Sequence, residues 1–294
     1  MNTKVIYGTE LAAKVKERIK NDVRELEEDG CRAPKLVVIQ VGDNPSSDTY
    51  VRNKVKACEE VGFKSEVIKF DNTYMARLKY EIEKLNSDRT VDGILVQMPL
   101  PGHLNENKVI SKIDPKKDVD GLHPVNSGEL FKGHTGGHFV FNDCLVPCTP
   151  LGIMEILREA EVELEGKHAV VLGRSPLVGM PVAKLLLDSN CTVTVCHSKT
   201  TEVDKICREA DILIAAVGKP KMVKRDWIKE GAVVIDVGIN RVDGKLVGDV
   251  DFDDVMGKAG VITPVPKGVG AMTVAMLLQN TLKAYEREFG GRYE

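Results

Sequence analysis

Tyr50 and Lys54 stand four residues apart, after an apolar run and an Asn-Pro turn. If this segment is a helix, the two side chains share one face. The preceding run, residues 35–42, resembles a buried strand, and open α/β sheets bind ligands beyond the carboxyl ends of their strands. An amine partly removed from water there could act as an acid or base near neutrality. A solvent-exposed helix position, as for Arg52 and Lys56, is the simpler alternative for Lys54.

Other polar groups follow apolar runs further along the chain. Gln97 ends the run "DGILVQM" before a Pro-Leu-Pro turn, and Asp118 and Asp120 stand in "KDVDGLHP". An amide and a carboxylate at adjacent strand ends can bind a polar heterocycle through hydrogen bonds. The alternative is a capping amide and turn carboxylates, which is the favoured interpretation of Asp118.

The segment "KHAVVLGRSPLVGMP", residues 167–181, predicts a strand that enters a helix through a turn at Gly173. Backbone N–H groups in such a turn can hold a phosphate. Ser175 stands where the usual G-x-G-x-x-G motif has its second glycine, so an ordinary strand-to-helix connection is the alternative. The Pro- and Gly-rich loop "TPVPKGVGAMT" also opens a helix and could hold a carboxylate or phosphate.

The next predicted strand ends in "CHSKT" and favours NADP over NAD. An NAD-binding domain places a carboxylate there to bind the adenosine ribose. This chain has none at His197, Ser198 or Lys199, and Arg174 lies in the phosphate turn. A ribose phosphate prefers a guanidinium group and hydroxyl donors. Arg174 and Ser198 as solvated loop residues are the alternative.

Apolar, β-branched runs alternate with helix-like segments through most of the chain, which predicts parallel strands with helical crossovers. We expect helices over residues 9–29, 46–61, 75–87, 150–162, 178–189 and 270–289. The predicted fold is two α/β domains with a cleft between them, the second being Rossmann-like. We place the first domain at 1–147, joined by the C-terminal helix 270–294, and the second at 148–269.

The 294 residues carry 41 basic and 44 acidic side chains, a net charge of -3 that argues against a nucleic-acid partner. No apolar stretch approaches the roughly 20 residues that span a membrane, and no signal peptide is evident. Seven cysteines without a C-x-x-C pair indicate free thiols in a reducing compartment. We therefore expect a cytoplasmic protein.

Three histidines suggest a metal site, which we do not favour. His134 and His138 lie in "GHTGGH", and His123 follows Asp118 and Asp120. Glycines between His134 and His138 argue against a helix that would present both rings on one face, and no glutamate has metalloprotease spacing.

Eight ordered motifs together carry a resemblance to a known family. They are "VGDNPSSDTYVRNK", "DGILVQMPLP", "KDVDGLHPVNSGEL", "PCTPLG", "VVLGRSPLVGMP", "TVTVCHSKT", "VVIDVGIN" and "TPVPKGVGAMT". They resemble the bifunctional methylenetetrahydrofolate dehydrogenase/methenyltetrahydrofolate cyclohydrolase family over residues 35–282. The resemblance implies NADP-dependent oxidation of 5,10-methylenetetrahydrofolate and hydrolysis of the methenyl product to 10-formyltetrahydrofolate. It also implies a role in one-carbon metabolism and purine biosynthesis, and a homodimer.

The resemblance also implies site residues. Lys54 would be the central catalytic residue, with Tyr50 stacking on the folate and Gln97 adjusting the lysine. Ser47 would support the site, and Cys148 and Thr149 belong to the family's "PCTP" turn. The other implied substrate contacts are Val96, Met98, Asp120, Pro266, Gly268 and Gly270. The implied cofactor contacts are Gly173, Arg174, Ser175, Ser198 and Ile239.

Two residues depart from the family pattern Pro-Gly-Gly-Val-Gly-Pro-Met-Thr. Lys267 replaces a glycine and Ala271 replaces a proline. If the replaced glycine has a positive φ, Lys267 is strained or shifts the loop.

An NADP-binding sensor or scaffold without turnover is one alternative function. A metal-dependent hydrolase using Asp118, Asp120 and His123 is the other.

Overall fold

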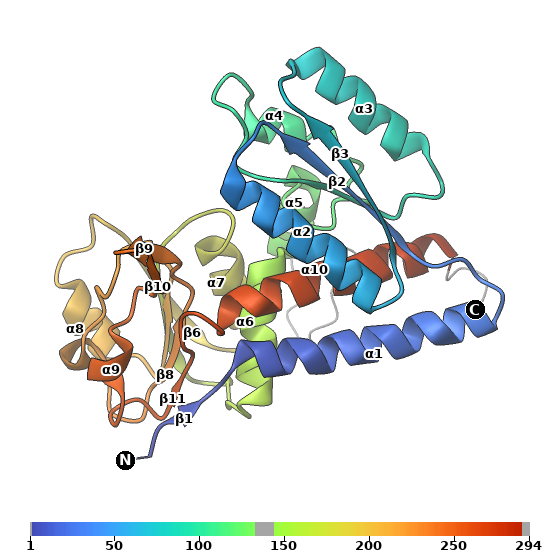
Figure 1. Ribbon diagram of the computed structural model, residues 1–294. Coiled ribbons are helices and arrows are strands. Elements are labelled where there is room, and N and C mark those ends of the chain that lie inside the picture. Colours follow the sequence, from blue (N-terminus) through green and yellow to red (C-terminus); the bar gives the residue numbers. More distant parts are fainter. Residues whose placement is uncertain (1, 133–143, 290–294) are drawn as a thin grey trace. The chain divides into compact units, whose positions relative to one another are not determined.

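The computed structural model describes residues 2–132 and 144–289, which form two compact units (Figure 1). The unit that contains Lys54, called the Lys54 unit below, comprises residues 13–129, 144–148 and 274–289. The unit that contains Gly173, called the Gly173 unit, comprises residues 2–12, 130–132 and 149–273.

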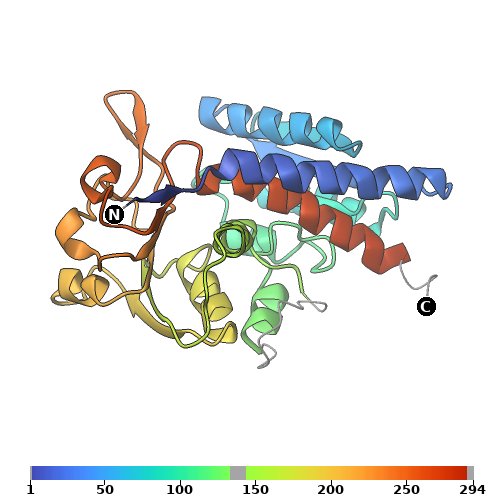
Figure 2. The ribbon, with the colours of Figure 1, turned by 90° about the horizontal axis from the view of Figure 1, so that it is seen from below.

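The Lys54 unit is built on a parallel sheet of three strands in the order β3-β2-β4. These strands are β2 (Lys35–Val41), β3 (Lys64–Phe70) and β4 (Gly93–Val96). Its helices include α2 (Pro45–Glu60), α3 (Met75–Ser87), α4 (Glu106–Ile110), most of α5 (Pro124–Lys132), and the larger parts of α1 (Gly8–Glu28) and α10 (Val269–Phe289). Figures 1 and 2 show α1 and α10 side by side, and Arg18 Nη2 donates to Gln279 Oε1 at 2.8 Å.

Alternating residues of β2 explain how this sheet is buried on both faces. Val37, Ile39 and Val41 pack in one cluster with Leu78 and Ile82 of α3. Side chains alternate along a strand, so the intervening buried residues belong to the opposite face. The register sets Ile39 opposite Val96, and the carboxyl ends of β2 and β4 therefore lie together.

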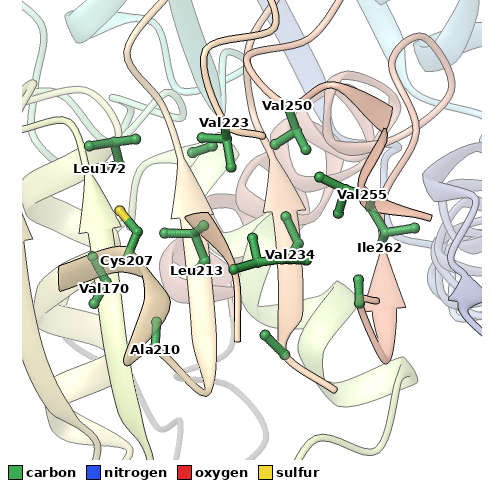
Figure 3. Packing of buried hydrophobic residues seen from close by; sticks show 14 of the residues in the cluster. Val170, Leu172, Cys207, Ala210, Leu213, Val223, Val234, Val250, Val255 and Ile262 are labelled. Atoms are coloured by element: carbon green, nitrogen blue, oxygen red, sulfur yellow. The ribbon is translucent and has the colours of Figure 1, made fainter. Parts of the chain in front are cut away.

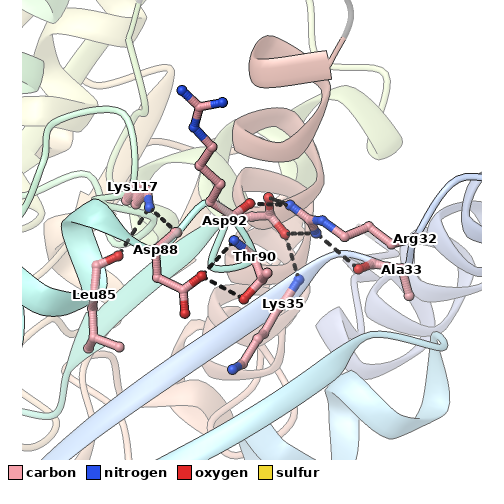
Figure 4. A network of polar contacts seen from close by, with 9 residues as sticks. Arg32, Ala33, Lys35, Leu85, Asp88, Thr90, Asp92 and Lys117 are labelled. Atoms are coloured by element: carbon pink, nitrogen blue, oxygen red, sulfur yellow. Dashed lines mark hydrogen bonds and ion pairs between the residues drawn. The ribbon is translucent and has the colours of Figure 1, made fainter.

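A polar network holds the amino-terminal side of this sheet (Figure 4). The buried Asp92 carboxylate accepts two hydrogen bonds from Arg32, both at 2.7 Å, and one from the Lys35 N–H at 2.7 Å. The buried Lys117 ammonium donates to the carbonyls of Leu85 and Asp88, at 3.1 and 2.7 Å. Lys117 thus anchors the segment that leads to the Asp-Val-Asp sequence at residues 118–120.

Asp92→Asn is expected to lower the free energy of unfolding by about 2 kcal/mol, because Arg32 loses a bidentate anionic partner. Urea denaturation measures the change. Glu83→Gln is the control, since Glu83 pairs with Lys79 on an exposed helix face, and we expect less than about 0.5 kcal/mol there. Equal effects would contradict the assignment of Asp92 as an anchor.

The Gly173 unit contains a six-stranded parallel sheet in the order β1-β11-β8-β7-β5-β6. Its strands are β1 (Lys4–Val5), β5 (His168–Leu172), β6 (Thr192–Cys196), β7 (Ile212–Ala215), β8 (Val233–Asp236) and β11 (Val261–Ile262). Its helices include α6 (Cys148–Glu159), α7 (Gly179–Asp188), α8 (Val203–Arg208), α9 (Phe252–Val255) and the short 3-10 helix η1 (Arg225–Trp227). Figure 3 shows Val170, Leu213 and Val234 of adjacent strands packed in the core of this unit. A parallel sheet whose strands alternate with helices is the α/β arrangement expected for the second domain.

The first strand, β1, belongs to a different unit from the one that the sequence-based division gave it. That division placed residues 1–147 in a single domain. Lys4 and Val5 pair with Val261 and Ile262 at the edge of the larger sheet, so residues 2–12 group with the Gly173 unit. A strand of two residues is too short for a periodic pattern, and only its pairing reveals it.

A two-stranded antiparallel hairpin, β9 (Asn240–Val242) and β10 (Lys245–Val247), extends from the same unit. Its apolar residues Val242 and Leu246 are exposed. None of the helices in the described ranges has both the length and the apolar composition needed to cross a membrane.

Candidate active site

Lys54 and Gln97 meet at the carboxyl edge of the three-stranded sheet. Lys54 is half-buried on α2, and its Nζ donates to Gln97 Oε1 at 2.9 Å. Gln97 Nε2 donates to the Met98 carbonyl at 2.7 Å, and the Gln97 N–H donates to the Ile39 carbonyl at 2.8 Å. These two bonds fix the glutamine with its amide oxygen toward the lysine. Val96 is buried and Met98 half-buried on either side of it.

The Asp120 carboxyl and the Cys148 thiol complete the surroundings of the Lys54 amine. Loss of water lowers the pKa of Lys54 from its ordinary value of 10.5, while Asp120 and Cys148 act in the opposite direction. Burial raises the pKa of Asp120, and the Lys54 charge opposes that rise. Burial also raises the pKa of Cys148, so the thiol stays protonated at neutral pH. Burial therefore makes the neutral form of Lys54 easier to reach than that of a surface lysine.

Tyr50 lies one turn before Lys54 on α2 and is 47% exposed. Ser47, in the first turn of the same helix, is buried. An exposed ring next to the half-buried amine is free to stack on a flat heterocycle.

The turn after β5 is shaped by two glycines. A Cβ at Gly173, where φ is +122°, would lie 2.2 Å from the Ala216 carbonyl oxygen. A Cβ at Gly179 would lie 2.3 Å from the Gly173 carbonyl oxygen. The Ser175 hydroxyl accepts the N–H groups of Val178 at 3.1 Å and Gly179 at 3.4 Å. The serine therefore caps the start of α7, which gives a physical reason for a serine in place of a glycine. The exposed Arg174 side chain stands beside it.

The turn after β6 lies at the same edge, because Leu172 and Cys196 are in register. The His197 N–H donates to Thr200 Oγ1 at 2.9 Å, and the Lys199 N–H donates to His197 Nδ1 at 3.1 Å. Ser198 is exposed within this turn, which contains no carboxylate.

Two buried aspartates, not identified from the sequence, organise the loops after β7 and β8. The Asp249 carboxylate accepts the N–H groups of residues 217–219, at 2.6, 2.9 and 2.8 Å, and the Asn240 side-chain amide at 2.9 Å. Asp236, whose pKa burial raises to about 7, accepts the N–H of Gly238 at 3.0 Å. Ile239 lies between Gly238 and Asn240, which these two aspartates bind, and its side chain is 52% exposed. Its Cδ1 atom is 3.6 Å from the position that a Cβ at Gly270 would occupy.

The loop from Pro264 to Gly270 is tightly packed at its centre. A Cβ at Gly268 would lie 2.3 Å from the Pro264 carbonyl oxygen. Lys267 has a φ of +81°, so the position where the family pattern has a glycine is in the conformation that glycine tolerates best. The Lys267 carbonyl accepts the Thr9 N–H at 3.2 Å, which holds the residue in place, while Pro266 is exposed.

Lys267→Gly is expected to raise the free energy of unfolding by about 1 kcal/mol by relieving this strain. Chemical denaturation of the ligand-free protein measures it. Lys116→Gly, at an exposed turn position without a positive φ, should lower stability because glycine gains entropy in the unfolded chain. A loss of stability in both variants would refute strain at Lys267.

Asp118 and His123 are bound to neighbouring groups of their own loop. Asp118 Oδ2 accepts the His123 N–H at 2.7 Å and Asn126 Nδ2 at 2.9 Å. His123 Nδ1 accepts the Val125 N–H at 3.1 Å. Among the described residues, no group of three or more His, Cys, Asp or Glu side chains could hold a metal ion. His134 and His138 lie outside the described residues.

Comparison with known proteins decides the family. Residues 6–120 match the family model of the tetrahydrofolate dehydrogenase/cyclohydrolase catalytic domain, and residues 147–289 match that of the NAD(P)-binding domain of the same family. A relative from Bacillus cytotoxicus, "Bifunctional protein FolD", is 51% identical over 96% of each chain. The chain belongs to the tetrahydrofolate dehydrogenase/cyclohydrolase family.

Solved structures of other family members have the same fold as this chain. The bifunctional FolD enzyme of Campylobacter jejuni is 46% identical, with a TM-score of 0.92 over 97% of this chain and 99% of that one. The Trypanosoma brucei enzyme, solved with NADP and an inhibitor, is 40% identical, with a TM-score of 0.90 over 98% and 99%.

These comparisons confirm the expected family, the two-domain α/β fold and the enzyme class. The chain is a bifunctional dehydrogenase and cyclohydrolase of folate one-carbon metabolism. Neither alternative, a sensor or scaffold without turnover or a metal-dependent hydrolase, is favoured.

Proposed function

We propose that one site centred on Lys54 carries both reactions, with NADP as the oxidant. The observation that supports it is the half-buried Lys54 amine, held at 2.9 Å by Gln97 in a charged environment shared with Asp120. An amine with a lowered pKa is suited to acid-base chemistry near neutral pH.

For the oxidation, the protein chiefly has to align the reactants. Bound NADP would supply a nicotinamide ring as the acceptor of the hydride that leaves the methylene carbon of 5,10-methylenetetrahydrofolate. Lone pairs on the two flanking nitrogens stabilise the resulting methenyl cation, so no base is required for this step. A neutral Lys54 tolerates that cation better than an ammonium would. In this proposal Asp120 holds the pterin ring by hydrogen bonds, and Tyr50 stacks on the folate.

For the hydrolysis, Lys54 acts on water. The neutral amine takes a proton from the water that attacks the methenyl carbon, and a C–O bond forms. The hydroxyl of this adduct then gives up its proton and becomes the formyl C=O as the bond from the carbon to N5 breaks and N5 takes up a proton. This gives 10-formyltetrahydrofolate, and Lys54 releases its own proton to solvent. Gln97 keeps the amine directed toward the site through both steps. Val96, Met98 and the loop residues Pro266, Gly268 and Gly270 are the further proposed substrate contacts.

We assign the turns after β5, β6 and β8 to the binding of NADP. Gly173 and Ser175 shape the turn into α7, and Ile239 is the proposed contact from the loop after β8. Arg174 and Ser198 would bind the ribose phosphate, and the absence of a carboxylate among residues 197–200 supports NADP over NAD. The proposed reacting groups, Lys54, Gln97 and Asp120, thus lie in the Lys54 unit, and the proposed cofactor contacts lie in the Gly173 unit.

We also propose a cytoplasmic homodimer. All seven cysteines are free and six are buried, as is usual in a reducing compartment. The exposed hairpin with Val242 and Leu246 offers an apolar surface and open strand edges for a second copy. A sedimentation mass of a single chain would contradict the dimer.

The proposed function is tested by adding 5,10-methylenetetrahydrofolate and NADP and following methenyl absorbance. We expect the absorbance to rise and then decay as the formyl product accumulates, with a smaller rate when NAD replaces NADP. A chelator should leave both phases unchanged. No signal with either cofactor would refute the proposal, and a rise without decay would refute its hydrolytic half.

A further inference from the structure

Asn280 of α10 joins two segments that are distant in the chain. Its side chain is buried, and its Nδ2 donates to the Val119 carbonyl and to the Val146 carbonyl, both at 2.9 Å. The same nitrogen lies 3.6 Å from Cys148 Sγ. A side-chain amide has two N–H donors in one plane, and here both are used on backbone carbonyls.

The two carbonyls stand next to residues of the proposed site. Val119 directly precedes Asp120, and Val146 lies two residues before Cys148. The Cys148 thiol donates to the same Val119 carbonyl, at 3.3 Å. Since Asp120 follows Val119 directly and Cys148 is bound to the Val119 carbonyl, the positions of these two side chains depend on how the two segments are joined.

The packing around Gly121 shows how close these segments are. A Cβ at Gly121, where φ is +72°, would lie 2.5 Å from the Val146 carbonyl carbon and from the Pro147 nitrogen. A small shift of one segment against the other would therefore move Asp120 relative to Lys54.

We propose that Asn280 is a positioning residue, which sets Asp120 against Lys54 by fastening the segments 119–121 and 146–148. The inference rests on the proposed role of these side chains in folate chemistry. Asn280 itself touches no reacting group, and its effect passes through the Val119 and Val146 carbonyls.

The adjacent Thr281 provides a matched control. It is also buried on α10, but its hydroxyl donates to the Leu277 carbonyl of the same helix, at 2.8 Å. Thr281→Val therefore removes a buried hydrogen bond without touching either segment.

The test compares Asn280→Leu, of similar size, with Thr281→Val in kcat/KM for methenyltetrahydrofolate hydrolysis. We expect roughly a tenfold or greater loss for Asn280→Leu and little change for Thr281→Val, with KM for NADP unchanged in both. In an Asp120→Asn background, Asn280→Leu should cost much less than it does alone, because both act on the same group. Equal losses in the two single variants, or an additive double variant, would overturn the proposal.

A second measurement does not depend on turnover. The labelling rate of Lys54 by an amine-reactive reagent, compared with that of the exposed Lys56, is read by mass spectrometry. We expect faster Lys54 labelling in Asn280→Leu and no change in Thr281→Val, as the space beside the amine opens. An unchanged ratio would overturn the inference, whereas wild-type protein without folate turnover would contradict only the proposed function. A cooperative urea transition followed by far-UV circular dichroism shows that the Asn280→Leu variant is folded.

Discussion

Lys54→Met is expected to reduce methenyltetrahydrofolate hydrolysis by at least about 100-fold, because the group that takes the proton from water is lost. Methionine keeps an unbranched chain of similar length, so packing around α2 should change little. The affinity for NADP should stay the same, since the proposed cofactor contacts lie in the other unit. The decay of methenyl absorbance, started from purified methenyl substrate, measures the hydrolysis.

Lys56→Met is the matched control, an exposed lysine on the same helix that should retain wild-type rates. The dehydrogenase step of Lys54→Met should fall less than the hydrolysis, because hydride transfer needs alignment rather than a base. Hydrolysis at the wild-type rate in Lys54→Met would remove this lysine from the mechanism.

Ser198→Asp is expected to raise the KM for NADP by roughly 10- to 100-fold, because a carboxylate would face the ribose phosphate and a hydrogen bond of about 1.5–3 kcal/mol would be lost. The KM for NAD should stay the same or fall, since a carboxylate in this turn can accept the ribose hydroxyls. Steady-state kinetics with each cofactor, at saturating folate, give both constants.

Ser198→Ala separates the charge from the missing hydroxyl. This variant should weaken NADP less than Ser198→Asp does and should not improve NAD. If Ser198→Asp weakened both cofactors equally, a general disruption of the turn would be the better explanation, and the NADP assignment from this turn would be lost.

Much of the fold could be predicted from the sequence because long elements have strong periodicity. The expected helices at 9–29 and 75–87 are observed as α1 and α3 within one residue at each end. The short elements could not be predicted in the same way. β1 has two residues and β9 three, and a register of pairing, rather than a pattern of side chains, defines them.

In the candidate site, too, some residues could be predicted from the sequence and others could not. Lys54 and Gln97 could be proposed from their position after strands, and the structure brings them to 2.9 Å. Asn280 and Asp249 could not, because a buried amide or carboxylate in an apolar or mixed segment has no sequence signature of its partners. The strain at Lys267 could not be predicted without the structure. It follows from the φ of +81°, which glycine tolerates and lysine does not favour.

The proposed mechanism requires a Lys54 amine that loses its proton more easily than a surface lysine does. It is tested most directly by an NMR titration of protein labelled at the lysine side chains, with Lys54→Arg to assign the Lys54 resonance. We expect a Lys54 pKa below the ordinary 10.5, because burial disfavours the charged amine, with the exposed lysines of the same sample as the reference. A Lys54 resonance that titrates together with those of the surface lysines would contradict it.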